Sequence, residues 1–169
     1  MATSFSGTVR VIVDALLEDT VDIGGVKHTI GYSPMNTLSN GTAANQAKQV
    51  FTDRRTLAAS GTENIDLSGV LVNAFGAVIN FAKIKAIVIV AAAANTNNVH
   101  VGGHASAAFV NWVTDATAII KVKPGGIFLL TAPDANGFAV TATTGDLLTI
   151  ANSGSGTSVT YDIVLIGTV

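Results

Sequence analysis

The sequence has no cysteine and few charged residues. Only 12% of its 169 residues are Asp, Glu, Lys or Arg, about half the share of roughly 25% in an average soluble domain. Without cysteine the chain can form neither disulfides nor thiolate metal sites, so its stability has to come from packing and from assembly. Because so little of the surface can be charged, we expect part of it to contact other chains.

Basic residues are few and scattered, and the formal net charge is −2. Nucleic-acid binding requires a clustered basic patch, so we expect no nucleic-acid partner. The most apolar stretch, residues 84–94, falls short of the ~20 apolar residues that cross a bilayer, so we expect no membrane partner. The first residues lack the basic start and apolar core of a signal peptide, which predicts synthesis in a cytoplasm without secretion by that route.

The most informative stretch is KIKAIVIVAAAANTNN, residues 83–98. Four consecutive β-branched residues, Ile87 to Val90, favour a pleated strand. Apolar residues on both faces indicate a strand that is covered on both sides. The polar run Asn95 to Asn98 ends it as a turn. We therefore expect this strand to lie in the middle of a sheet, with the other strands arranged around it.

Turn signals recur about every 8–12 residues through the second half of the chain. Pro124-Gly125 fits the two central positions of a type II turn, and residues 133–137 combine Pro, Asp, Asn and Gly. Short strands separated by such turns indicate an all-β sandwich or barrel and not βαβ units. No linker divides the chain, so the sequence predicts a single β-sandwich domain over residues 1–169.

Residues 1–60 are predicted to form either an N-terminal arm, made of a strand and a hairpin, or part of the sandwich. A strand is expected over residues 5–17, and a hairpin is expected on the Gly24-Gly25 turn with Val26, His28 and Ile30 on one face. Residues 43–51 are expected to include a short helix, followed by a strand over residues 55–59. The early acidic residues are expected to crowd a solvated loop: Asp14, Glu18, Asp19 and Asp22.

Two histidines, His100 and His104, have the only plausible metal-ligand spacing. A zinc site needs three or four ligands, and no third ligand lies nearby in the sequence, so we expect ordinary loop histidines and no metal or cofactor. Serines fall in turns, and the sequence has no G-x-S-x-G elbow. The absence of a nucleophile–base arrangement predicts that the protein is not an enzyme.

A candidate interaction surface comprises the asparagine turn and an aromatic pair: Asn95, Asn97, Asn98, Phe109 and Trp112. Trp112 with Phe109 could stack on a sugar ring. The alternative, a hydrophobic plug over one end of the sandwich, is favoured by the large area that an aromatic side chain buries.

Three blocks of the sequence resemble one family when taken together. They are TLSNGTAANQAKQVFTDRRTLAASGTENIDLSGVLVNAFG at residues 37–76, FAKIKAIVIVAAAANTNNVHVGG at residues 81–103, and VKPGGIFLLTAPDANGFAV at residues 122–140, followed by residues 144–169. The chain resembles structural proteins of tailed-bacteriophage virions, and within that group the β-sandwich proteins that decorate or cement the capsid. The matching motifs are strand and turn patterns, so no catalytic or ligand residue carries over.

The resemblance implies a jelly-roll-like antiparallel β-sandwich that assembles as a homo-oligomer, with a trimer favoured. It also implies a place on the capsid surface, where the protein would bind the major capsid protein and stabilise the shell. The alternative is a tail, baseplate or head-fibre component whose sandwich binds a receptor or a glycan. A hydrolytic or metal enzyme on a sandwich is a further competitor.

Overall fold

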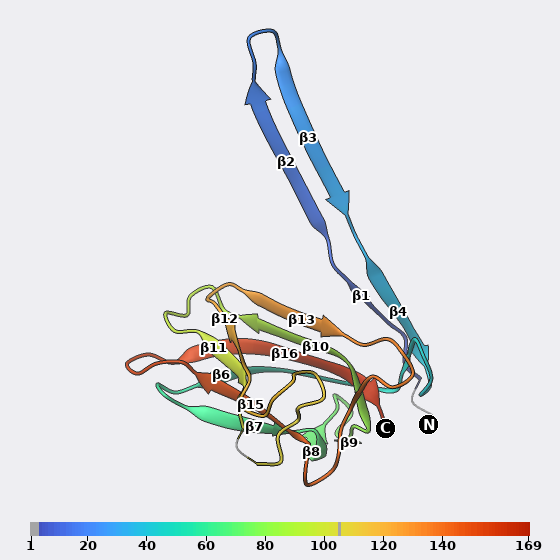
Figure 1. The fold of residues 1–169 in the computed structure, drawn as a ribbon. Coiled ribbons are helices and arrows are strands. Elements are labelled where there is room, and N and C mark those ends of the chain that lie inside the picture. The colour runs from blue at the N-terminus through green and yellow to red at the C-terminus, as the bar shows by residue number, and fades with distance from the viewer. Residues whose placement is uncertain (1–3, 105) are drawn as a thin grey trace.

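The computed structural model describes residues 4–104 and 106–169 and has an all-β fold. Within these residues all regular elements are strands, and no helix is long and apolar enough to cross a membrane. Most strand pairs are antiparallel, and a five-stranded and a four-stranded sheet form a β-sandwich-like body. Figure 1 shows these layers stacked, with a two-stranded ribbon projecting from them. The prediction of an all-β fold is confirmed.

The first sheet contains the longest strands. Its order is β13-β10-β16-β6, and β14 pairs with the start of β10. The bounds are β6 (Gln49–Leu57), β10 (Lys83–Ala91), β13 (Ile127–Thr131), β14 (Phe138–Ala139) and β16 (Val159–Thr168). The predicted central strand is therefore β10, which pairs with β13 on one side and β16 on the other.

The second sheet has the order β12-β11-β15-β7. Its strands are β7 (Thr62–Asp66), β11 (Val99–Gly102), β12 (Ile119–Val122) and β15 (Leu147–Asn152). Within each sheet, early strands pair with late strands, and the pairs of the two sheets are nested in the sequence. The pairs are β6 with β16, β7 with β15, β10 with β13 and β11 with β12. The chain thus runs out through four strands and returns through the four strands that pair with them.

The core lies between the two sheets. On β10, alternate side chains from Ile87 point inward, and Ile89 is completely buried. The second sheet contributes Val99, Val101 and Ile150 to the same cluster. At the start of β10 the strand is buried on both faces, as predicted, but Val88 and Val90 farther along are half-exposed on the outer face. The outer face of the first sheet is therefore incompletely covered.

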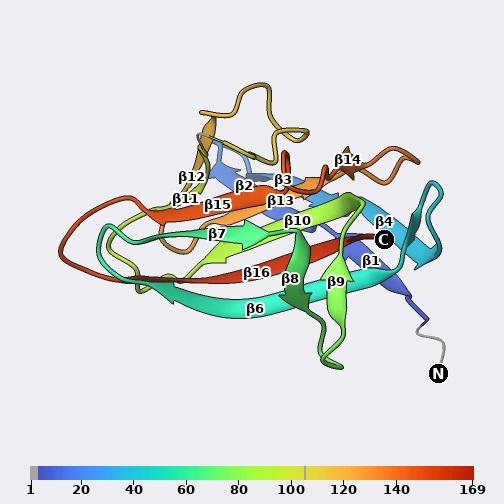
Figure 2. The same cartoon turned by 90° about the horizontal axis from the view of Figure 1, so that it is seen from below.

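Three smaller pieces flank the body. β1 (Gly7–Arg10) pairs with β4 (Met35–Asn40), which also pairs with β5 (Gln46–Ala47). β8 (Ser68–Val72) and β9 (Val78–Asn80) form a hairpin below the body in Figure 2. β2 (Val13–Thr20) and β3 (Gly25–Tyr32) form the projecting ribbon, which we call the arm (residues 13–32).

Two local predictions were wrong. The short helix expected within residues 43–51 is replaced by β5 and β6. The reason is that β6 forms nine residue pairs with β16, and this pairing overrides a weak local preference for helix. The predicted acidic loop is a strand instead, because Asp14, Glu18 and Asp19 lie within β2, opposite residues of β3. The hairpin turn spans residues 21–24, where Val21 N–H donates to Gly24 O at 3.0 Å.

Candidate interaction surfaces

The arm has no buried residue in either strand. It continues β1 and β4 outward, and Val11 N–H donates to Pro34 O at 3.0 Å where it leaves the body. The arm has no hydrophobic core of its own, and an isolated two-stranded hairpin is marginally stable in water. The stability of the arm therefore has to come from contacts outside the hairpin.

The two faces of the arm differ in chemistry. In an antiparallel pair, directly opposite residues share a face, so the register Val13↔Tyr32, Ala15↔Ile30, Leu17↔His28 and Asp19↔Val26 defines one face. This apolar face is aliphatic and aromatic apart from one histidine and one aspartate. Leu17, near its middle, is 71% exposed. Alternation of this kind is typical of a strand pair that is buried on one side, yet none of the residues that the structure describes covers that side.

The opposite face of the arm is polar. It carries Asp14 opposite Gly31, Leu16 opposite Thr29, and Glu18 opposite Lys27. Glu18 and Lys27 form an exposed ion pair, which is worth little stability at such exposure. Leu16 is the only large apolar side chain on this face, so the polar face suits contact with water.

A second, incompletely covered surface is the outer face of the first sheet, and at its β13 edge Asn36 of β4 donates to Thr131 at 3.0 Å. The register places its residues in three rows, each of which crosses β6, β16, β10 and β13 in that order. The rows are Val50, Ile166, Ala86 and Thr131; Thr52, Val164, Val88 and Leu129; and Arg54, Asp162, Val90 and Ile127. Most of these side chains are aliphatic, and only Ala86 is buried. Ile127 is 70% exposed. In Figure 1 β7 and β15 of the second sheet lie below the first sheet and the arm extends upward, so the arm projects on the side of this outer face.

A third uncovered surface is the β8–β9 hairpin. Leu71 and Ile79 are opposite each other and are buried against the body. Val72 and Val78 form the next pair and are exposed, and Phe75 in the turn between them is 84% exposed. This hairpin lies at the lower end of the molecule in Figure 1, away from the arm.

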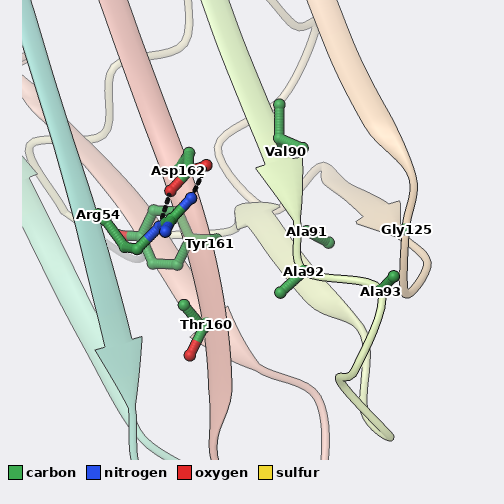
Figure 3. Close-up of a pocket in the computed structure, with 9 residues that line it drawn as sticks. All are labelled: Arg54, Val90, Ala91, Ala92, Ala93, Gly125, Thr160, Tyr161 and Asp162. Atoms are coloured by element: carbon green, nitrogen blue, oxygen red, sulfur yellow. Dashed lines mark hydrogen bonds and ion pairs between the residues drawn. The ribbon is translucent and has the colours of Figure 1, made fainter.

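A shallow hollow of about 420 Å³ opens beside the end of β10, where the chain turns away at Ala92 and Ala93. Figure 3 shows Arg54 and Asp162 paired with each other on neighbouring strands at one side of it. Their side chains form two hydrogen bonds, of 2.6 and 2.8 Å, and the guanidinium holds the pKa of Asp162 below its ordinary value. Since the two charges satisfy each other, the hollow offers no free charged group to a ligand.

The asparagine turn serves mainly to hold two loops together. Asn95 donates from its amide to Thr160 O at 2.9 Å and accepts from Thr160 N–H at 2.8 Å. Asn97 donates to the side chain of Asn152 at 3.0 Å, and Asn98 N–H donates to Ser153 Oγ at 2.9 Å. All three asparagines are half-buried, and their contacts join the turn after β10 to the loop between β15 and β16.

The aromatic pair lies largely inside the molecule. Phe109 is 3% exposed and belongs to the core cluster, so its side chain is not at the surface. Trp112 is half-buried, its indole Nε1 donates to Phe109 O at 2.7 Å, and its ring lies 5.6 Å from that of Phe128. The pair and the asparagine turn are not brought together into one surface by any contact among the described residues.

The two histidines of the sequence motif are held separately. His100 lies on β11, opposite Lys121 and Ala151. Burial and the nearby lysine lower the pKa of His100, which favours its neutral form. His104 hydrogen-bonds to Asn64 at 3.1 Å through Nε2, while its Nδ1 contacts the backbone of Ser106. Among residues 4–104 and 106–169, no three His, Asp or Glu side chains are grouped to hold a metal ion.

One polar network spans the two sheets. Tyr161 on β16 is fully buried, and its hydroxyl donates to Glu63 Oε1 on β7 at 2.6 Å. Arg55 on β6 donates to Glu63 Oε2 at 2.5 Å and to Asp53 at 3.0 Å, and it stacks over the Phe51 ring at 5.7 Å. Burial and the hydrogen bond to Glu63 raise the pKa of Tyr161. The network fastens the β6–β7 side of the sandwich.

Replacing Tyr161 by phenylalanine is expected to lower the free energy of unfolding by about 1–3 kcal/mol, because Glu63 loses a buried hydrogen-bond donor while the ring stays packed. Tyr32, the other tyrosine of the chain, is exposed on the arm and provides the matched control. Tyr32→Phe should leave the urea midpoint of the monomer unchanged. Equal urea midpoints for the two variants would contradict the structural role of the network.

Comparison with known protein families, curated proteins and solved structures finds no match to this chain. The proposed function of this protein therefore depends on the surfaces of the chain itself. The apolar face of the arm is the main feature that sequence analysis missed. The sequence predicts one strand of this face, with Val26, His28 and Ile30 on the same side. The other strand of this face carries Val13, Ala15 and Leu17, and it was not predicted as part of the hairpin, because a strand was expected to end at Leu17 and the acidic residues indicated a loop.

Proposed function

We propose that this protein is a non-enzymatic structural component of a tailed-bacteriophage virion, a decoration or cement protein on the capsid surface. It would bind the major capsid protein and assemble with copies of itself, with three copies favoured. The observation that carries the proposal is that apolar surface is uncovered on more than one side of the body: the arm, the outer face of the first sheet, and the β8–β9 hairpin. Large exposed apolar patches are typical of interaction sites.

The strand order supports the kind of fold that the proposal needs. Apart from the two-residue strand β14, eight body strands lie in two sheets of four, and their pairing is nested from β6 with β16 to β11 with β12. A jelly roll is built from eight strands in two sheets and is common in viral capsid proteins. We assign the body to this class as part of the proposal.

A subunit within a shell has neighbours on several sides, and the uncovered surfaces of this chain face in different directions. The β8–β9 hairpin lies away from the arm (Figure 1). We assign its exposed cluster of Val70, Val72, Phe75 and Val78 to the contact with the capsid. A protein that binds only the assembled shell adds binding free energy that the disassembled state lacks, and it thereby stabilises the shell.

The function is tested on expanded, empty capsids of the virus that carries this gene. Added protein should bind them and raise their melting temperature, while Phe75→Ser should weaken the binding at least about tenfold because an exposed aromatic anchor is lost. Ile23→Ser is the matched control, because Ile23 is 97% exposed in the turn of the arm and lies outside the assigned contact. Absence of binding would overturn the function, and binding that Phe75→Ser leaves intact would overturn only the assigned surface.

A further inference from the structure

We propose that the apolar face of the arm packs on the outer face of the first sheet of a second copy of this chain. This deepens the proposed function, because it assigns the contact through which copies assemble. Each copy would give one arm and receive one.

The arm cannot cover its apolar face with its own body. Each of its strands has eight residues, which at about 3.3 Å per residue carries the turn some 26 Å beyond the junction. Pro34 separates β3 from β4 and the two ends of the arm are hydrogen-bonded at Val11, so the arm leaves the body as one ribbon. Figure 1 shows it extending away from the sheets and not folding back.

The two surfaces match in chemistry and in size. The apolar face of the arm offers valine, leucine, isoleucine and tyrosine, and the outer face of the first sheet offers valine, leucine and isoleucine over four strands. Faces of two β-sheets pack on each other about 10 Å apart when both are apolar. In a reciprocal exchange each copy contributes the eight residues of its apolar arm face and the eleven unburied residues of the three outer-face rows, close to the about 20–30 residues that a stable interface uses on each side. Two such arm-on-sheet contacts together therefore make an interface of ordinary size.

Charge favours the body of another copy over another arm. Residues 13–32 contain four acids and one lysine, which gives −3, and because the whole chain carries −2 the remaining residues carry +1. Two arms packed on each other would bring together two surfaces of −3, whereas an arm on a body joins −3 to +1. The one acid on the assigned rows of the outer face, Asp162, is already paired with Arg54. The polar face of the arm, with Glu18 and Lys27, would remain in water.

The arrangement can also close. The arm projects on the same side of the body as the outer face of the first sheet (Figure 1). A copy can therefore donate and accept on one side, and a pair or small ring of copies can satisfy every arm without leaving an open end. Such closure would cover both of these apolar surfaces together.

The contact is tested by cross-linking, which is clean because the chain has no cysteine of its own. Full-length Leu17→Cys protein is mixed with full-length Val164→Cys protein and treated with a short bismaleimide. Leu17 lies on the apolar face of the arm, and Val164 lies in the middle row of the outer face. We expect a cross-linked heterodimer from the mixture. Leu16→Cys is the matched control, because the same residue type on the polar face should cross-link much less.

Equilibrium sedimentation gives the second readout. Leu17→Ala should weaken self-association at least about tenfold, since one buried leucine contributes about 1.5–3 kcal/mol, whereas Leu16→Ala should change it less than about twofold. A Leu17→Cys homodimer without the heterodimer would show that arms pair with arms and would overturn the proposal. A monomer without cross-links would overturn it too and would assign the arm to a different protein. Capsid binding is measured separately, so a monomer that still binds shells would leave the proposed function standing.

Discussion

Replacing Ile89 by alanine is expected to lower the free energy of unfolding by about 2–5 kcal/mol. Ile89 is completely buried on β10, between Phe128 of β13 and Ile163 of β16. Truncation would remove three methyl or methylene groups from the centre of the core and leave a cavity that three paired strands cannot collapse to fill. Whole domains are stable by only about 5–15 kcal/mol, so the loss should be visible as a large drop in the denaturant midpoint.

Ile127→Ala is the matched control for this substitution. Ile127 lies on β13, the strand next to β10, and is opposite Val90, but its side chain points outward and is 70% exposed. At protein concentrations where the chain is monomeric, its loss should change the free energy of unfolding by no more than about 0.5 kcal/mol. Equal effects at Ile89 and Ile127 would contradict the assignment of the inward face of β10.

The centre of the fold could be predicted because its signal is local. Ile87 to Val90 form a continuous β-branched run, and such a run has few conformations other than a strand. The same holds for the Pro124-Gly125 turn, where Gly125 has a φ of 73° and Gly126 N–H donates to Lys123 O at 2.8 Å. Each feature depends on neighbouring residues, so the sequence is sufficient to find it.

Features that depend on distant partners were not found. Residues 43–51 have a local alanine-rich pattern that favours a helix, yet β6 is a strand because β16, more than 100 residues later, lies beside it. The network of Tyr161, Glu63 and Arg55 joins three strands from different parts of the chain. No spacing within the sequence predicts that these side chains meet.

The apolar face of the arm was missed for a different physical reason. The charges at Asp14, Glu18 and Asp19 predict a solvated loop, because clusters of charged residues usually lie in solvated segments. An antiparallel hairpin tolerates such charges when they alternate with apolar residues, since alternate side chains point to opposite faces. A strand pair with one apolar face and no partner among the described residues is itself the pattern expected of an assembling protein.

Deleting the arm should therefore leave the folding of the body almost unchanged and abolish assembly. If residues 13–32 are replaced by Asn-Gly, a two-residue turn that suits an antiparallel hairpin, Ile12 and Ser33 are joined where the two strands already meet at Val11 and Pro34. The monomer should keep its free energy of unfolding within about 1 kcal/mol, because the arm has no buried residue and shortening a surface loop costs little. Self-association should be lost.

The two effects separate a docking arm from a structural one. Circular dichroism during thermal unfolding reports the body, and sedimentation reports assembly, so both are read on the same deletion protein. An unfolded deletion protein would mean that the arm stabilises its own body, which the exposure of both of its strands argues against. An oligomer that survives deletion would mean that other surfaces hold the copies together. A stable monomer is the expected result, because the arm can bury its apolar face only against another chain.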